Sequence, residues 1–179
     1  MVRPAVLSRV RAAGLLVFGS PFSANLIVER GEGKPGDWDG RIHLVWTERG
    51  SDDWIDRSWR CATRPGLPYL SQPMNPRGTG MVADGVQNRL SHQLGLHHGR
   101  AALVQVGAVR VLRDPDRDDI HEPVIPELNS GGGFNVHDVT HPNQLAGCIG
   151  LDARSMSELL DVFRTLEHYQ GPRVSLTVI

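Results

Sequence analysis

The sequence predicts a mostly β domain of the α+β class with one or more packed helices, and three observations support this prediction. Gly (20) and Pro (12) together exceed one residue in six of the 179, which favours many turns over a helical bundle. Several short segments alternate apolar and polar residues, as strands with one buried face do. One segment near the C-terminus carries apolar residues at clear helical spacing.

The composition narrows the classes of function. With 40% hydrophobic residues among 179, the chain is expected to form one globular domain with a real core. Its 19 Lys and Arg residues against 20 Asp and Glu residues leave a net charge of -1, which disfavours a nucleic-acid partner. No apolar run approaches the roughly 20 residues that a membrane-spanning helix needs, so no membrane span is expected.

Residues 1–40 are predicted to form an N-terminal extension packed on the main domain, which spans 41–179. Arginines before the apolar run 12–18 outline a secretory signal, but the run is short and residues 19–21 interrupt it. We therefore expect a strand or helix of the folded domain here rather than a signal peptide. Synthesis in the cytoplasm is expected, and the final compartment stays open.

Two segments, 41–46 and 54–62, flank the turn-rich residues 49–53 and are predicted to form a β-hairpin. The segment 64–77 contains four prolines and is predicted to be an extended crossing segment, because proline disfavours regular structure.

Further strands are predicted along the second half of the chain. The Val- and Leu-rich segments 101–106 and 108–112 are separated by Gly107. A short strand over 134–137 follows three glycines, and a closing strand spans 173–179.

One clear amphipathic helix is predicted between the last two of these strands. Ser155 and Glu158 match a capping box at its start, and Gly171 followed by Pro172 ends it. Its apolar stripe consists of Met156, Leu159, Leu160, Phe163 and Leu166.

The two cysteines, Cys61 and Cys148, are far apart in sequence and do not make a disulfide framework, although they could pair with each other. Cys61 alternates with Trp59 as on a half-buried strand, which favours a buried and unpaired thiol.

Cys148 lies in a stretch where chemistry is expected. His137 ends a predicted strand, a loop follows, and Gly147 precedes Cys148. A thiol with an ordinary pKa of about 8.5 is only slightly ionised at neutral pH, and a nearby imidazole can accept its proton. Gly147 lets a substrate approach closely, and backbone N–H groups of residues 147–149 are candidates to stabilise an oxyanion.

A series of short motifs occurs in order over roughly residues 55–165. The motifs are QPMNPRGT at 72–79, LHHG at 96–99, ALVQ at 102–105, VLRD at 111–114, NVH at 135–137 and AGC at 146–148. This series resembles the L,D-transpeptidase catalytic-domain family, bacterial cysteine enzymes that cross-link or trim peptidoglycan. It is most similar to a phage and bacterial branch related to that family.

The resemblance implies an L,D-transpeptidase-like β-sandwich or barrel with packed helices for residues 41–179. It implies that Cys148 is the nucleophile and His137 its imidazole partner in acyl transfer on peptidoglycan stem peptides. The activity would be that of an L,D-transpeptidase or of an L,D-carboxypeptidase or endopeptidase, without a cofactor or metal. Delivery to the cell wall would follow from that substrate.

Two positions depart from the family motif. Ala146 stands where the motif has His, and Gly150 stands where it has Arg, so groups that would hold substrate or orient the thiol are missing. The alternative is a non-catalytic module with a degenerate site, which binds cell wall or forms part of a phage particle or injection apparatus.

Other polar residues are candidates for the missing roles. His97 occupies a family-like position and is the preferred second catalytic imidazole, whereas His98 would face the other side of a strand. In the loop, His141 and the side-chain amides of Asn143 and Gln144 are candidates for substrate binding near the thiolate.

Two metal sites stand as weaker alternatives. A three-ligand zinc set of His137, His141 and Cys148 lacks any paired zinc motif. A calcium loop over 114–125 lacks glycine at its sixth position and glutamate at its twelfth, so a solvated acidic turn is expected instead. The carboxylates in question are those of Asp114, Asp116 and Asp118.

Overall fold

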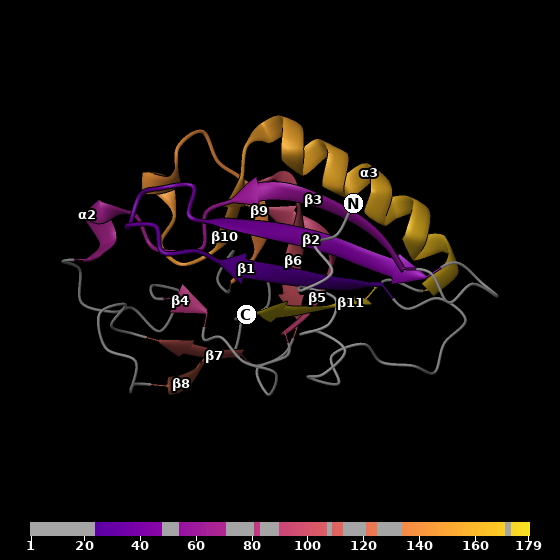
Figure 1. The fold of residues 1–179 in the computed structure, drawn as a ribbon, viewed down its shortest axis with the longest axis horizontal. Helices are drawn as coiled ribbons and strands as arrows, with labels where there is room; N and C mark the ends of the chain where they lie inside the picture. Colours follow the sequence, from indigo (N-terminus) through magenta and orange to yellow (C-terminus); the bar gives the residue numbers. More distant parts are fainter. Residues whose placement is uncertain are drawn as a thin grey trace.

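The computed structural model of the chain describes residues 24–47, 54–70, 81–82, 90–106, 109–112, 121–124, 134–170 and 173–179. These residues form a mixed eight-stranded sheet, a three-stranded sheet and one long helix, α3, Ala153–Gln170 (Figure 1). The predicted mostly β, α+β class is confirmed. No helix among these residues is long and apolar enough to cross a membrane.

The strands of the large sheet follow the order β10-β9-β6-β5-β11-β1-β2-β3. Their bounds are β10 Ile149–Leu151, β9 Val136–Asp138, β6 Arg100–Val106, β5 Leu90–His97, β11 Arg173–Val178, β1 Asn25–Arg30, β2 Gly40–Thr47 and β3 Trp54–Cys61. The small sheet consists of β4 Met81–Val82, β7 Val109–Leu112 and β8 His121–Val124. In the ribbon view of Figure 1 the small sheet lies on the side away from α3.

The predicted hairpin over 41–62 is confirmed, since β2 and β3 pair antiparallel from Gly40 opposite Cys61 to Thr47 opposite Trp54. The predicted strands over 101–106 and 108–112 correspond to β6 and β7, which belong to different sheets. The closing strand is confirmed as β11, which lies inside the large sheet between β5 and β1.

The two edges of the large sheet meet at one point. Ala62, directly after edge strand β3, and Gly150, in edge strand β10, exchange two backbone hydrogen bonds of 2.8 and 3.0 Å. The sheet is therefore curled so far that its first and last strands touch, as in a barrel closed at one end.

Helix α3 packs where these edges come together, and it contacts β3, β9 and β10. Its predicted apolar stripe is confirmed, because all five of its residues belong to the core. The N-cap is Asp152 rather than the predicted Ser155: the Asp152 carboxylate accepts from the Ser155 N–H and hydroxyl at 2.9 and 2.7 Å. The sequence favours Ser155 because Ser with Glu three residues later matches the capping-box pattern one turn further on.

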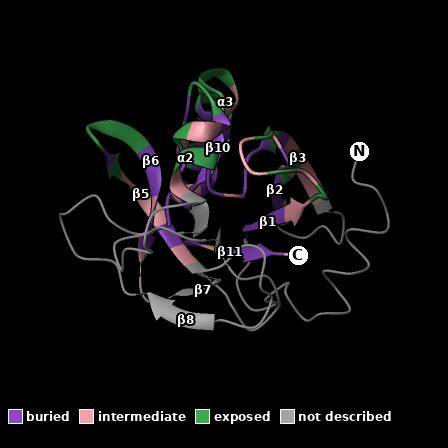
Figure 2. Ribbon diagram, turned by 90° about the vertical axis from the view of Figure 1, so that its left-hand side faces the viewer, coloured by how far each residue is buried: buried purple, intermediate pink, exposed green. Residues whose placement is uncertain are grey.

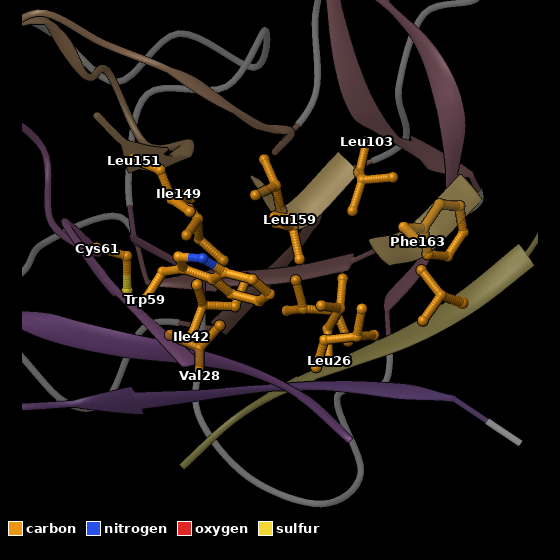
Figure 3. Packing of buried hydrophobic residues seen from close by; sticks show 14 of the residues in the cluster. Leu26, Val28, Ile42, Trp59, Cys61, Leu103, Ile149, Leu151, Leu159 and Phe163 are labelled. Carbon is orange, nitrogen blue, oxygen red and sulfur yellow. The ribbon is translucent and has the colours of Figure 1, made fainter. Parts of the chain in front are cut away.

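The core lies between α3 and the concave face of the large sheet, with buried residues from β1, β2, β3, β6 and β11 (Figure 2). Figure 3 shows Leu159 and Phe163 of α3 reaching towards Leu26 of β1 and Leu103 of β6. Trp59 packs in the same cluster and donates its indole N–H to Glu158 at 3.1 Å, which fixes α3 on β3.

Two segments differ from expectation. Residues 25–30 of the predicted N-terminal extension form β1, an interior strand between β11 and β2. The predicted extended segment 64–77 is wrong over Leu67–Leu70, which form one helical turn, α2. Pro68 is compatible with that turn, because the first N–H groups of a helix have no partner within it. The signal-like run 12–18, the motif at 72–79 and the acidic residues 114–119 lie outside the described residues.

A buried carboxylate ties the loop before β2 to the end of β3. Asp39 accepts from the N–H and the hydroxyl of Thr63, both at 2.6 Å, and forms an ion pair with Arg64. The Asp39 side chain is fully buried, so these three donors replace the water that its charge has lost.

A second charged cluster crosses three strands. The buried ring of His43 on β2 contacts Asp56 on β3 through Nδ1 at 3.2 Å and Glu29 on β1 through Nε2 at 3.1 Å. Burial alone would lower the pKa of His43, but the hydrogen bonds and charges of the two carboxylates outweigh it and raise this pKa. The imidazolium therefore links the strands when it is protonated.

Replacing His43 by Gln is expected to lower the free energy of unfolding by about 2 kcal/mol at pH 6, and by less at pH 9. A raised pKa means that this contribution is complete below the ordinary histidine pKa and is lost as the pH rises through the folded value. Urea unfolding of the wild type and of His43→Gln at the two pH values measures the difference in the free energy of unfolding. The contributions of the other histidines cancel, because both proteins contain them. A deficit that grows towards pH 9 would contradict the assignment.

Candidate active site

Strands β9 and β10 place His137 and Cys148 side by side. The strands run parallel, with Ile149 opposite Val136 and Gly150 opposite His137. Cys148, one residue before β10, therefore lies next to Asn135, and the Ile149 N–H donates to the Asn135 carbonyl at 2.9 Å. This bond removes Ile149 from the predicted oxyanion donors of residues 147–149.

The β5–β6 hairpin carries His97 to the same place. His97 is the last residue of β5 and pairs with Arg100 across a two-residue turn. Both turn residues have positive φ, 49° at His98 and 77° at Gly99, as the tightest hairpin turns require. Arg100 forms an ion pair with Asp138, which ties the hairpin tip to β9. His98 is exposed, but it lies in the turn and its ring stays beside that of His97, with centroids 4.2 Å apart. The expectation that the two adjacent histidines face opposite sides of a strand is therefore wrong.

Three predicted residues form one cluster. A ring nitrogen of His97, a ring nitrogen of His137 and the Cys148 Sγ all lie within 4.8 Å of one another. The two imidazole rings have centroids 4.3 Å apart and are tilted by 34°. Cys148 retains 8% of its surface and His97 9%, so the cluster is nearly, but not fully, closed to solvent.

The hydrogen bond of His137 fixes its tautomer. Nδ1 lies 2.9 Å from the backbone carbonyl of Asp138. A carbonyl only accepts, so Nδ1 carries the proton and Nε2 keeps a lone pair. Burial lowers the pKa of His137, although the Asp138 carbonyl and carboxylate oppose this. His137 is therefore neutral at pH 7 and able to accept a proton at Nε2.

Cys148 is held as a neutral thiol. Burial raises its pKa to about 11, and a hydrogen bond with the Asn135 backbone opposes the rise only in part. No disulfide joins Cys61 to Cys148, and Cys61 is buried in the core as predicted. Cys148 and His137 can therefore react by removal of the thiol proton during attack, rather than by attack of a thiolate formed beforehand.

Iodoacetamide is expected to alkylate Cys148 at pH 7 about 300-fold more slowly than an ordinary thiol, because the thiolate fraction falls tenfold for each unit that the pKa rises. The rate should climb steadily with pH up to about 11. A Cys61→Ala background isolates Cys148, and peptide mass spectrometry follows the modification. Fast alkylation that is independent of pH around neutrality would show a preformed thiolate and contradict the assignment.

The loop residues predicted to bind substrate serve the loop itself. The Gln144 side-chain carbonyl accepts from the N–H groups of Thr140 and His141 at 3.0 and 3.2 Å, and His141 Nδ1 accepts from the Asn143 N–H at 3.2 Å. The Asn143 side chain accepts from the Leu67 N–H at 3.2 Å. The last of these bonds holds the loop against Leu67, and His141 is not part of the Cys148 cluster.

The structure gives a physical reason for glycine at position 150. A Cβ there would lie 2.8 Å from Leu145 Cδ1 and from Val139 Cγ2, so a larger side chain does not fit. The backbone of Gly150 also pairs on both sides, with Ala62 and with β9. An arginine at position 150, two residues after Cys148, is thus incompatible with this packing. The second imidazole of the cluster is that of His97, which comes from β5.

Asn135 and Asp138 also belong to the site and were not predicted from the sequence. Asn135 is almost fully buried and donates from its side-chain nitrogen to His97 Nδ1 at 2.9 Å. One signal was available, because Asn135 and His137 are two residues apart and share one face of a strand. The role of the Asp138 carbonyl had no sequence signal, since every residue has one.

The side chains of Cys148, His137 and His97 are also candidate ligands for a metal ion. A thiolate and two imidazoles with an open fourth position suit Zn²⁺, and His137 already has a second partner at Nδ1, as zinc-bound imidazoles do. His97 fits less well, because Asn135 occupies its Nδ1 lone pair. His97 would become a third ligand only by giving up that bond.

Comparisons of this chain with protein-family models, with curated proteins and with solved structures return no match.

Proposed function

We propose that this chain is a cysteine-dependent acyl transferase or peptidase that acts on peptidoglycan stem peptides through an L,D-transpeptidase-like domain. The observation that carries the proposal is the cluster of Cys148, His137 and His97, in which one ring nitrogen of each histidine and the Cys148 Sγ lie within 4.8 Å of one another. The Asp138 carbonyl leaves the Nε2 lone pair of His137 available as the base.

The reaction has two halves. Nε2 of His137 takes the thiol proton as Cys148 Sγ bonds to the peptide carbonyl carbon, and the carbonyl oxygen becomes an oxyanion. Collapse of this intermediate breaks the C–N bond, and the proton passes from His137 to the leaving amine. A water or a second amine then attacks the thioester, the C–S bond breaks, and the thiol is restored.

The substrate class comes from the motif series and from no contact in the structure. Enzymes that resemble this chain act next to a meso-diaminopimelate-like or D-amino-acid centre of the stem peptide. Hydrolysis and transpeptidation differ only in the acceptor, water or amine, so one site serves either outcome.

The burial of Cys148 favours a second candidate, a non-catalytic module that binds cell wall. A thiol of a residue that is only 8% exposed, with a pKa raised to about 11, is a weak nucleophile until a base removes its proton. The glycine required at position 150 also leaves the site without the arginine of the family motif.

Turnover of muropeptides followed by mass spectrometry tests the two candidates. The wild-type protein and a Cys61→Ala variant are expected to form a trimmed or cross-linked product, whereas Cys148→Ala forms none. Cys61→Ala is the matched control, because it removes the other buried thiol at a cost of about 1 kcal/mol in stability.

Two results would contradict the acyl-transfer proposal. Product formed equally by the wild type and Cys148→Ala would remove the cysteine from the mechanism. Sedimentation of the protein with purified sacculi, without product from any form, would support the binding module instead.

A further inference from the structure

The oxyanion of the proposed reaction needs a hydrogen-bond donor. The Ile149 N–H donates to the Asn135 carbonyl and the Gly150 N–H to the Ala62 carbonyl, so neither serves the substrate. A donor from outside the Cys148 loop would fill this need, and His97 is the other polar side chain in the cluster.

The orientation of the Asn135 amide is fixed by β6. The Gln105 backbone N–H donates to Asn135 Oδ1 at 2.9 Å, which identifies that atom as the oxygen. In return, the Gln105 side-chain oxygen accepts from the Phe134 N–H at 2.7 Å. This reciprocal pair holds the Asn135 side chain between β6 and β9, with its NH₂ group directed at His97.

The amide in turn fixes the tautomer of His97. Asn135 Nδ2 only donates, so His97 Nδ1 is the acceptor of the 2.9 Å bond and carries no proton. Burial and the neighbouring His137 and His98 lower the pKa of His97 to about 4, so the ring is neutral and holds one proton. That proton is on Nε2, the reverse of the arrangement in His137.

We propose that His97 donates a hydrogen bond from Nε2–H to the oxyanion, and that Asn135 is the positioning residue that keeps His97 in this tautomer. The inference rests on the proposed acyl transfer. The Asp138 carbonyl and the Asn135 amide thus give the two imidazoles opposite roles. His137 accepts a proton, and His97 donates a hydrogen bond without becoming charged.

Nitrogen-15 NMR of the uniformly labelled protein tests the tautomers directly. In the wild type at pH 7, His97 is expected to show a protonated Nε2 and an unprotonated Nδ1, and His137 the opposite pattern. In Asn135→Asp, the carboxylate can only accept, so the proton of His97 is expected to move to Nδ1. A merely structural Asn135 would leave the tautomer of His97 unchanged.

Kinetics with a stem peptide test the donor role. His97→Phe keeps a ring but no donor and is expected to lower kcat about 100-fold with little change in KM. His97→Gln places an amide N–H close to the former Nε2–H and is expected to recover much of that loss. Asn135→Asp is expected to lower kcat in parallel with the loss of the Nε2–H form.

Several outcomes overturn the inference. A wild-type His97 protonated at Nδ1 would refute the tautomer, even if acyl transfer is observed. Equal kcat values for His97→Phe and His97→Gln, or full activity of Asn135→Asp with its tautomer reversed, would refute the donor role. If the wild type forms no product while His97 carries its proton on Nε2, the acyl-transfer function and the oxyanion role fall, and the tautomer alone stands.

Discussion

Replacing His137 by Gln is expected to lower kcat for a stem peptide by about 1,000-fold, the loss typical when a positioned base is removed. Gln keeps the polarity and approximate size of the ring but has no lone pair of comparable basicity. The residual activity should rise with pH towards about 11, where Cys148 ionises without help. The kcat of the wild type should instead be constant at every pH above the ordinary histidine pKa. His137 is already neutral there, because its pKa is lowered.

The pH profiles of the two proteins separate a base from a structural residue. A variant that loses activity by the same factor at every pH would show that His137 only supports the fold. Circular dichroism and the free energy of unfolding of His137→Gln serve as the control, since the 2.9 Å bond to the Asp138 carbonyl is also lost.

Replacing Asp39 by Ala is expected to lower the free energy of unfolding by about 3–5 kcal/mol, the range for breaking a buried ion pair from one side. The Thr63 N–H and hydroxyl would lose their 2.6 Å partner, and Arg64 would lose its counter-ion. Because Ala62 holds the bridge to Gly150 next to this network, closure of the sheet should weaken as well.

Urea denaturation measures this loss, with Asp37→Ala as the matched control. Asp37 is an exposed carboxylate of the same loop and accepts from the Lys34 N–H at 3.2 Å. Its removal is expected to cost less than about 1 kcal/mol. Equal losses for both variants would contradict a special role for the buried carboxylate.

Much of the fold follows from local pattern. The β2–β3 hairpin, β6, β7, β11 and α3 have alternation or a helical stripe that depends on each segment alone. The interior place of β1 and the bridge between Ala62 and Gly150 depend on pairing between distant segments, which no local pattern encodes. The sequence alone does not fix the N-cap of α3, because Asp and Ser are both common cap residues and the structure selects Asp152.

Three members of the candidate site were predictable from the sequence, whereas the hydrogen-bond partners that distinguish its two imidazoles were not. Motif order pointed to Cys148, His137 and His97, and the structure brings these three together. The distinction between the two imidazoles comes from a carbonyl at Asp138 and an amide at Asn135. Such second partners are set by the register of β9 against its neighbours, which only three-dimensional coordinates give.

Rapid acid quenching of the protein during turnover of a stem peptide, followed by mass spectrometry, tests the central claim most directly. The account predicts a thioester on the proteolytic fragment that contains Cys148, with the mass of the acyl part of the substrate. The fragment that contains Cys61 should stay unmodified. Turnover at the wild-type rate by Cys148→Ala, with no adduct on Cys148 in the wild type, would contradict the account.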